Sequence, residues 1–471
     1  MSGSVGTVGW NRRIADASSL RIEEQQHAVA AAEEDASPLV ARIHLEAEDI
    51  DVEPLGRREV GSVEAGFEDL KGTHLGKREA GSGKRKPHGI QPACLRLPLP
   101  ASLFPHMPLA AVFPAPLAPI ELRDIPLPKL EQGAALLRTM YSEVCGTDVH
   151  LYHGRLGVPF PIIPGHVSVG VVSDMRGPIR DVHGEEIREG DVVTFLDVHE
   201  TCGACYHCLV TMQPNRCPSR RVYGITYSAN EGLLGGWSEA IWLKPGVKMI
   251  RLPRSLSPET FIGGGCGLVT ALHAIDLAHL RLGESVAVLG VGPVGQSVVA
   301  LASLSGAGRV IAIGGPKDRL EYAKRMGATE ALALDESPEE RLVKVRESTG
   351  GRGVDVVIEA SGAPEAVSQG LDLLRDGGRM VVCGHYTDNG PVEIHPHWQL
   401  NRKHVSVQGC WGTRYEHFHR AVELADQFGA IKPWREMVSA RYGLSSVATA
   451  LEQVERRLAI KALIVPNDSS V

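Results

Sequence analysis

The stretch "ESVAVLGVGPVGQSVVALASLSGAGRVIAIGG", residues 284–315, decides the fold. Its first apolar run, 286–289, is typical of a strand buried on both faces of a parallel sheet. Gly290, Gly292 and Gly295 then follow with the spacing G-x-G-x-x-G, where a strand gives way to a helix. The stretch therefore predicts a strand, a glycine-rich turn, a helix and a second strand.

This arrangement is the usual binding unit for a dinucleotide. Gly290 allows the tight turn, Gly292 allows close approach of a pyrophosphate, and Gly295 allows the helix to pack closely on the strand. We expect the pyrophosphate at the helix N-terminus, Pro293 and Val294, where free N–H groups and the helix dipole favour negative charge. Further strands are expected in "DVVIEASG" and "GGRMVVCG", so the sheet continues.

The end of the second strand bears on the choice between NAD and NADP. In NAD-binding units an acidic residue about 20 positions after the glycines binds the ribose hydroxyls. Gly314 occupies that place, so no carboxylate repels a 2′-phosphate, and Lys317 or Arg319 is a candidate to attract one. For Lys317, a plain surface charge on the next helix explains the residue equally well. Both cofactors stay open.

A second group of motifs predicts a metal centre. "YSEVCGTDVHLYHG" carries Cys145, and "PIIPGHVSVGVV" presents His166 after a Pro-Gly turn. "GGGCGLVTALHAI" places Cys266 after a glycine run that permits close backbone approach. Two cysteines and one histidine, far apart in sequence, match the ligand set of a catalytic zinc with an open fourth position.

The stretch "TCGACYHCLVTMQPNRC" predicts a second metal site. Four thiolates with no histidine are typical of a closed tetrahedral zinc site that orders a loop. An iron–sulfur cluster is the alternative, because a proline follows the last cysteine, but the bacterial cluster motif has a much shorter final gap. The predicted ligands are Cys202, Cys205, Cys208 and Cys217.

Composition limits the classes of protein. The chain has 471 residues and a net charge of -7, which gives no reason to expect a nucleic acid or an anionic membrane as a partner. The N-terminus lacks the pattern of a signal peptide, and no uncharged apolar run is long enough for a membrane span. Nine cysteines, three of them in "CGACYHC", suggest metal thiolates in a reducing compartment. We therefore expect a cytoplasmic protein.

Residues 1–106 differ from the rest of the chain. Apolar residues are sparse there and charges are frequent, so we expect a disordered extension or an upstream start-site error, with Met107 beginning the folded unit. A basic cluster in this region is a candidate nucleic-acid or targeting patch, but solvated, disordered chain is the favoured reading. The cluster consists of Lys77, Arg78, Lys84, Arg85 and Lys86.

Taken in order, these motifs resemble the zinc-dependent medium-chain alcohol and polyol dehydrogenase family, from Met107 to the C-terminus. The resemblance rests on "CGTDVH", "PGHVSVG", "GDVV", the four-cysteine lobe, "GCGLVTALHAI", "GVGPVG" and "VVIEASG". It implies an α/β fold with a GroES-like β-barrel catalytic domain and a Rossmann domain, in a homodimer or homotetramer. The expected divisions are the extension (1–106), the catalytic domain with the zinc lobe (107–256), the Rossmann domain (257–404) and a C-terminal part completing the catalytic domain (405–471).

The resemblance also implies roles for single residues. Cys145, His166 and Cys266 match the catalytic zinc ligands, and the four-cysteine lobe matches the structural zinc site. Thr147 matches the hydroxyl that takes the substrate proton, and His150 the histidine that passes it toward solvent. The implied reaction is zinc-assisted hydride transfer between a small-molecule alcohol, either a secondary alcohol or a polyol, and NAD or NADP, with the carbonyl as the other substrate.

The sequence departs from the family at two points. Val167 stands where the family usually has a glutamate after the zinc-binding histidine, and the last gap of the cysteine lobe is one residue longer than usual. A zinc-free enone or quinone reductase of the same fold is disfavoured, because it has no use for these ligands. A non-catalytic dinucleotide-binding relative is supported only by Val167.

Overall fold

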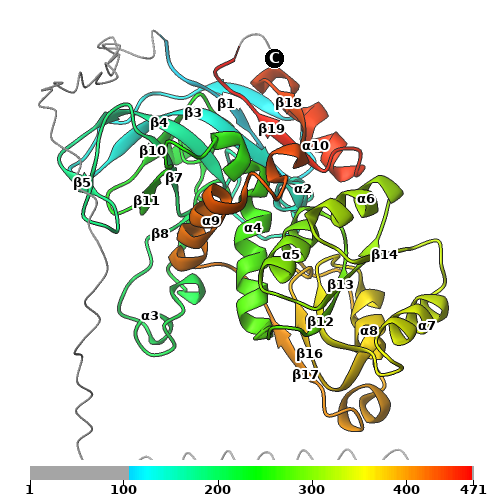
Figure 1. Ribbon diagram of the computed structural model, residues 1–471. Helices are drawn as coiled ribbons and strands as arrows, with labels where there is room; N and C mark the ends of the chain where they lie inside the picture. Colours follow the sequence, from blue (N-terminus) through cyan, green and yellow to red (C-terminus); the bar gives the residue numbers. More distant parts are fainter. Residues whose placement is uncertain (1–105, 469–471) are drawn as a thin grey trace, which may run out of the picture. The chain divides into compact units, whose positions relative to one another are not determined.

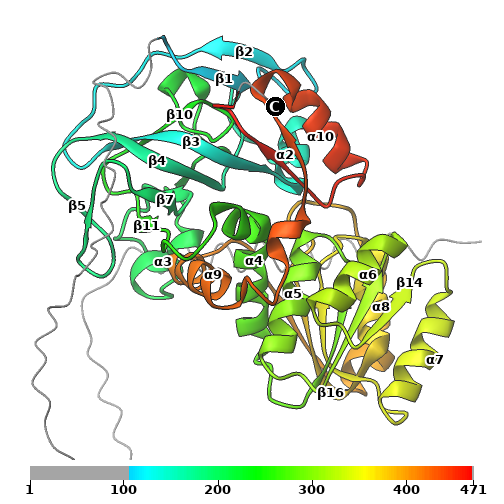
Figure 2. The same cartoon turned by 45° about the horizontal axis from the view of Figure 1, so that its top comes forward.

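The computed structural model describes residues 106–468. The predictions for residues 1–105, including the disordered extension and the basic cluster, lie outside the described residues. Within the described part, a mainly antiparallel half and a parallel half are joined by a long helix, α4 (Figure 1 and Figure 2).

The parallel half contains the sheet that the opening stretch predicts. Its strand order is β14-β13-β12-β15-β16-β17. From β12 the chain adds strands toward one edge of the sheet, and from β15 it adds them toward the other edge, so the direction reverses between β12 and β15. Ligands bind such sheets at the carboxyl ends of the strands near this reversal. The strands are β12 (Ser285–Leu289), β13 (Arg309–Gly314), β14 (Glu330–Ala333), β15 (Val354–Glu359), β16 (Leu374–Val382) and β17 (Ser406–Gly409).

Helices cover both faces of this sheet. Side chains alternate across a strand, and β12 shows the result: Val286 and Val288 pack with residues of α4, α5 and α6, whereas Ala287 and Leu289 pack with residues of α7 and α8. This two-sided burial explains the continuous apolar run. The helices are α5 (Pro293–Leu304), α6 (Lys317–Met326), α7 (Pro338–Ser348) and α8 (Pro364–Leu373).

The glycine turn after β12 has the geometry that its sequence predicts. Gly290 has φ 103°, and a Cβ there would lie 2.8 Å from Ser361 N; a Cβ on Gly295 would lie 1.8 Å from Gly290 O. Around Gly292 nothing lies within 4 Å of such a Cβ, which leaves open space at the start of α5. The predicted strand, turn, helix and second strand are therefore confirmed.

The antiparallel half is built on a seven-stranded sheet of order β11-β7-β4-β3-β19-β18, with β10 also paired to β3. Its strands are β3 (Ala135–Val144), β4 (Ser168–Met175), β7 (Val192–Phe195), β10 (Ala240–Leu243), β11 (Met249–Arg251), β18 (Val438–Tyr442) and β19 (Lys461–Ile464). Three two-stranded ribbons accompany it: β1 (Leu109–Val112) with β2 (Glu121–Asp124), β5 (Ile179–Arg180) with β6 (Glu186–Ile187), and β8 (Val198–His199) with β9 (Arg221–Val222).

The C-terminal segment returns to this sheet. β19 pairs antiparallel with β3, so that Leu463 lies opposite Glu143. Helices and turns complete this half and its connections: α2 (Gly146–Tyr152), α3 (Tyr206–Leu209), α9 (Tyr415–Phe428) and α10 (Val447–Glu455), with 3-10 turns η1 (Pro214–Arg216), η2 (Ala229–Glu231), η4 (Trp434–Met437) and η5 (Leu444–Ser446). A π segment, η3 (Pro396–Asn401), belongs to the parallel half, where it lies between β16 and β17.

Helix α4 (Pro258–Ala278) is a core helix. By length and apolar composition alone it could cross a membrane, but 72% of its most apolar window is buried inside the protein. α5 and α9 pack against it (Figure 1). Its apolar character therefore follows from its position between the two halves.

The parallel sheet extends beyond the predicted boundary at residue 404. β17 pairs parallel with β16, with Val407 opposite Met380. The Rossmann-type sheet thus continues to Gly409, and only the chain after it returns to the antiparallel half. The sequence "HVSVQG" is too short and too polar to indicate a buried strand, because this strand lies at the sheet edge.

Candidate active site and metal centres

The structure brings Cys145, His166 and Cys266 together with Glu143, an acidic residue that the sequence analysis missed. One ligand atom from each of the four lies within 4.8 Å of the other three. Cys145 Sγ and Glu143 Oε1 each lie 3.8 Å from His166 Nε2. Two sulfurs, an imidazole nitrogen and a carboxylate oxygen form a donor set that suits zinc.

Glu143 is held in place by a buried ion pair with Lys461, and both side chains are 0% exposed. Lys461 Nζ binds Glu143 Oε2, while Glu143 Oε1 faces the ligand cluster and accepts a hydrogen bond of 3.0 Å from Cys266 N. The chain therefore places a carboxylate at the metal centre from β3, although Val167 has replaced the one that the family usually carries beside the histidine.

A spacing in the sequence could have revealed Glu143. It precedes Cys145 by two residues at the end of an apolar strand, and residues two apart on a strand share a face. An acidic residue in "MYSEVC" that points the same way as a metal ligand is a candidate ligand itself. Its partner Lys461 lies 318 residues further along the chain, and only the pairing of β19 with β3 brings it close.

The glycine run before Cys266 has a specific steric cause. Gly265 has φ 48° and ψ -141°, which interrupts the helical path of α4. A Cβ there would lie 2.1 Å from Glu143 Oε2 and 2.5 Å from Lys461 Nζ. Because no side chain fits, glycine allows α4 to approach the buried ion pair and to deliver Cys266 to the cluster.

Asp148 and the other residues of the ligand cluster fix the position of Cys145 and favour its thiolate form. Asp148 accepts hydrogen bonds from Cys145 N at 2.8 Å and, more weakly, from Gly165 N at 3.4 Å, so it ties together the two segments that carry Cys145 and His166. A hydrogen bond from the Cys266 thiol, helped by His166 and opposed by burial, lowers the pKa of Cys145 well below its ordinary value. The thiolate that this favours is the form that binds metals.

Thr147 and His150 lie on α2, three residues apart, and therefore on one face of the helix. Both line the large cavity beside the ligand cluster. Thr147 N donates to Cys145 Sγ at 3.3 Å, which places this residue next to the first ligand. His150 Nδ1 lies 3.2 Å from Thr387 Oγ1, and burial together with the charge of Arg155 lowers the pKa of His150.

The cavity joins the two halves of the molecule. It has a volume of about 410 Å³ and reaches from the ligand cluster to the start of α5, where Gly292, Pro293 and Val294 line it. Ala360 and Gly384, which follow the parallel strands β15 and β16, also line it. The glycine turn and the metal ligands therefore face one space.

The residues proposed to select the cofactor differ in environment. Gly314 ends β13, and a Cβ there would lie 2.6 Å from Val291 Cγ2, so a carboxylate has no room at this position. Lys317 is exposed at the start of α6. Arg319 is 7% exposed, and its Nη2 donates to the carbonyls of Arg457 and Ala459 at 2.9 and 2.7 Å. The prediction that Arg319 attracts a 2′-phosphate is wrong, because this guanidinium is occupied in holding the C-terminal segment.

The four cysteines of the lobe also converge. Their sulfur atoms lie within 4.8 Å of one another, with Cys205 and Cys208 3.6 Å apart and Cys202 and Cys217 3.5 Å apart. No disulfide forms among residues 106–468, and all cysteines there are free thiols. Four thiols at these distances fit a closed tetrahedral site.

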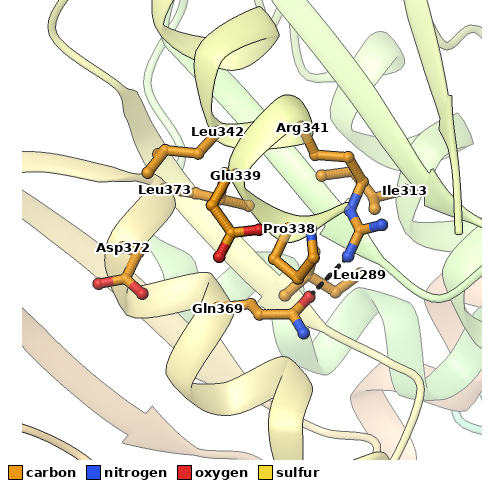
Figure 3. Close-up of a pocket in the computed structure, with 9 residues that line it drawn as sticks. All are labelled: Leu289, Ile313, Pro338, Glu339, Arg341, Leu342, Gln369, Asp372 and Leu373. Carbon is orange, nitrogen blue, oxygen red and sulfur yellow. Dashed lines mark hydrogen bonds between the residues drawn. The ribbon is translucent and has the colours of Figure 1, made fainter. Parts of the chain in front are cut away.

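A second, smaller cavity lies elsewhere, between α7 and α8 (Figure 3). Its volume is about 70 Å³, and a hydrogen bond of 3.1 Å from Arg341 Nη2 to Gln369 Oε1 crosses it. No residue predicted for the site lines it, so the chemistry belongs to the larger cavity.

Comparison with known proteins places the chain in a family. Residues 131–254 match the family described as "Alcohol dehydrogenase GroES-like domain", and residues 293–427 match "Zinc-binding dehydrogenase". A 5-exo-hydroxycamphor dehydrogenase of Pseudomonas putida is 32% identical over 349 residues, 73% of this chain and 95% of that protein. An L-threonine 3-dehydrogenase of Bacillus licheniformis is 30% identical over 346 residues, 73% and 94% of the two chains.

Solved structures of related proteins support the same family assignment. An alcohol dehydrogenase of Thermotoga maritima has a TM-score of 0.73 and 32% identity, covering 76% of this chain and 99% of its own. A structure from Sinorhizobium meliloti, bound to NADP, has a TM-score of 0.68 and 28% identity, covering 76% and 99%. The protein belongs to the zinc-binding medium-chain alcohol dehydrogenase family.

Membership confirms the predicted GroES-like and Rossmann domains. Glu143, Cys145, His166 and Cys266 form the catalytic zinc site, and the four-cysteine cluster forms the structural zinc site. The curated relatives are dehydrogenases of the polyol, threonine and camphor type.

Proposed function

We propose that the protein transfers hydride between a secondary alcohol and NAD or NADP. One observation carries the proposal: the catalytic zinc site, the Thr147–His150 face of α2 and the N-terminus of α5 all border one cavity. A substrate held there meets the metal site and the place expected for the cofactor at the same time. The relative solved with NADP supports a dinucleotide at the glycine turn.

The lining of the cavity offers apolar surface for a carbon skeleton, together with polar side chains such as Asn215, Thr226 and Thr270. The apolar surface can bury the skeleton of a secondary alcohol, and the polar side chains can form hydrogen bonds with further hydroxyl groups. The related 5-exo-hydroxycamphor dehydrogenase favours an alcohol with an apolar skeleton as the first substrate class to test. The apolar side chains of the lining include Leu156, Val158, Val222, Ile225, Val269 and Phe418.

Zinc held by Glu143, Cys145, His166 and Cys266 would supply a Lewis acid for the substrate oxygen, and a bound nicotinamide would supply the hydride acceptor. Thr147 Oγ1 takes the hydroxyl proton, because a hydroxyl group both accepts and donates a hydrogen bond. His150 lies one helical turn further on and accepts the proton from the relay. Its lowered pKa keeps the imidazole neutral, and thus ready to accept a proton, to lower pH than usual.

The test is alcohol-dependent reduction of NAD and NADP by the purified, zinc-loaded chain. We expect turnover with secondary alcohols from a panel that also includes polyols and amino alcohols. Reduction of enones by zinc-depleted protein would instead indicate the zinc-free reductase. A fully metallated, folded chain that binds a dinucleotide but oxidises no alcohol would indicate a non-catalytic relative.

A further inference from the structure

One residue of the cavity lining is not explained by zinc, cofactor or relay. Arg220 is the only arginine or lysine among the lining residues, and it is half-buried. It comes from the chain just after the structural zinc lobe, three residues beyond Cys217. No ion pair joins it to any carboxylate of residues 106–468, and the one hydrogen bond of its side chain is a long one of 3.5 Å to Cys217 O.

Arg220 is held in position by an aromatic wall. Its guanidinium carbon lies 5.0 Å from the centre of the Trp411 ring. Trp411 is itself stacked on Tyr386, with ring centres 5.5 Å apart and an angle of 11° between the planes, and its Nε1 donates to Tyr386 O at 3.1 Å. Stacking on an aromatic face orients a guanidinium and leaves its in-plane N–H groups free to bind a ligand.

The lining also carries one carboxyl group, that of Asp197. Asp197 is buried, and burial raises its pKa to about 6 although the charge of His166 opposes the shift. No ion pair links it to Arg220 among the described residues. The cavity therefore contains an acidic side chain and a cation that form no ion pair with each other. An unpaired charge beside apolar surface is unfavourable unless a ligand of opposite charge compensates it.

We propose that Arg220 is the binding residue for an anionic group of the substrate, so that the preferred substrates are secondary alcohols that carry a carboxylate. This inference rests on the proposed function and names its substrate class. The apolar lining takes the carbon skeleton, the zinc site takes the hydroxyl end, and Arg220 with its planar fork of donors takes the carboxylate, for which such a fork is well suited.

The cofactor pyrophosphate is the competing anion, since Gly292 to Val294 border the same cavity. Arg220 approaches from the zinc lobe and stacks on the loop after β17, whereas the glycine turn follows β12. A role in cofactor binding would change the affinity for NADH or NADPH, and a role in substrate binding would not. The two roles are therefore separable by measurement.

The experiment compares hydroxypentanoates, with the hydroxyl at carbon 2, 3 or 4, with their methyl esters and with 2-pentanol. In the unchanged protein we expect kcat/KM for the best acid to exceed that for its ester by about tenfold or more. Arg220→Met should raise KM for the acid by about 10- to 100-fold, the range for a charge-assisted hydrogen bond, and leave the ester within about twofold. Arg220→Lys should recover part of the loss.

Arg216 provides a matched control. Its guanidinium carbon lies 5.1 Å from the centre of the same Trp411 ring, but the residue is exposed and does not line the cavity. Arg216→Met should therefore leave the preference for acids unchanged. Equal losses for acid and ester in Arg220→Met, a weaker Kd for the reduced cofactor, or no preference for acids in the unchanged protein would each overturn the inference.

A binding measurement separates this inference from the proposed function. Pentanoate cannot be oxidised at a carbinol, so calorimetry with the zinc-loaded protein and cofactor reports anion binding alone. Binding that is lost in Arg220→Met, in a chain that oxidises no alcohol, would refute the proposed function and keep the anion site. Alcohol oxidation without pentanoate binding would keep the proposed function and refute the anion site. Melting temperature and zinc content of each variant exclude misfolding.

Discussion

Glu143 supplies a carboxylate to the catalytic zinc site from the end of β3. In this chain the residue after the zinc-binding histidine is Val167, which is buried in the apolar core. The acidic group arrives from β3 instead, two residues before Cys145, and carries its own buried counter-charge in Lys461. The site thus has four ligating side chains, and its carboxylate comes from β3 rather than from the position after His166.

The first prediction separates the structural and metal-binding roles of Glu143. Glu143→Gln leaves the buried Lys461 with two backbone carbonyls but no counter-charge, so we expect a loss of about 3–5 kcal/mol in the free energy of unfolding and weaker zinc binding at the catalytic site. In the double variant Glu143→Gln with Lys461→Met, stability should largely return, but zinc binding should not. Denaturant unfolding and zinc titration measure the two effects. Full recovery of zinc binding would show that Glu143 acts only through Lys461.

The second prediction concerns the relay on α2. Thr147→Val keeps the shape of the side chain and removes the hydroxyl, so turnover should fall by about a hundredfold, in the range for positioned acid–base groups. Thr147→Ser is the control and should keep most activity. His150→Gln should cost less, and its loss should shrink as the pH rises and solvent base replaces the imidazole. Near-normal turnover in a folded valine variant, judged by its melting temperature, would remove Thr147 from the mechanism.

At the scale of residues, the metal ligands that stand in sequence motifs could be predicted, but the residues that hold them in place could not. Cys145, His166 and Cys266 stand in motifs whose spacing indicates a metal. Arg319 shows the limit, because its two carbonyl partners lie about 140 positions away in sequence, where no local pattern points to them. Long-range hydrogen bonds of this kind depend on how the halves of the molecule meet.

Among the elements, we expect the start of α6 to influence the choice between NAD and NADP. Gly314 offers no carboxylate and no room for one, while Lys317 is an exposed cation at the first position of α6. The third prediction is that Lys317→Ala raises Kd for NADPH by about tenfold, the loss of one charge-assisted contact, and leaves Kd for NADH unchanged. Fluorescence titration measures both constants.

Arg319→Met is the control for that prediction. Its guanidinium binds the carbonyls of Arg457 and Ala459, so the substitution should lower the melting temperature and leave the ratio of the two cofactor affinities unaltered. If Lys317→Ala changes neither constant, Lys317 is a plain surface charge.

The zinc lobe, which runs from Cys202 to Cys217, supports the cavity as well as its own fold. The fourth prediction is that the purified chain holds two zinc ions, and that Cys266→Ala and Cys205→Ala each remove one. Cys266→Ala should abolish turnover. Cys205→Ala should lower stability and raise KM, because Asn215 of the lobe donates to Trp411 O at the cavity wall.

Elemental analysis counts the metal in each variant, and Cys383→Ala, a buried thiol outside both ligand sets, should keep two ions. Iron-type absorbance, or full activity in Cys266→Ala, would contradict the assignment of the two sites.

Elements with strong periodic signals were predicted well. The run before Gly290 is buried on both faces and reads as a strand for that reason. β17 gave no comparable signal, because all four of its residues are exposed, and the predicted domain boundary therefore fell before it. An edge strand is specified by its neighbour in the sheet more than by its own apolar pattern.

At the scale of the whole molecule, β17 leaves one edge of the parallel sheet unpaired within the described residues. It pairs with β16 on one side only, and Val407 at its centre is 48% exposed. Unpaired N–H and C=O groups on a flat edge are a template for another strand. We expect that strand to be a second copy of β17, placed by a two-fold axis.

The last prediction tests this edge. If two copies pair through β17, the full chain should be a dimer or a larger even-numbered assembly by light scattering. Val407→Lys places a charge at the centre of the edge, a substitution that disfavours strand pairing, and should yield folded chains of half the assembled mass or less. Val343→Lys is the matched control, since Val343 is 54% exposed on α7, away from this edge. A monomeric unchanged protein, or a Val407→Lys variant that keeps the same mass, would place any association elsewhere on the surface.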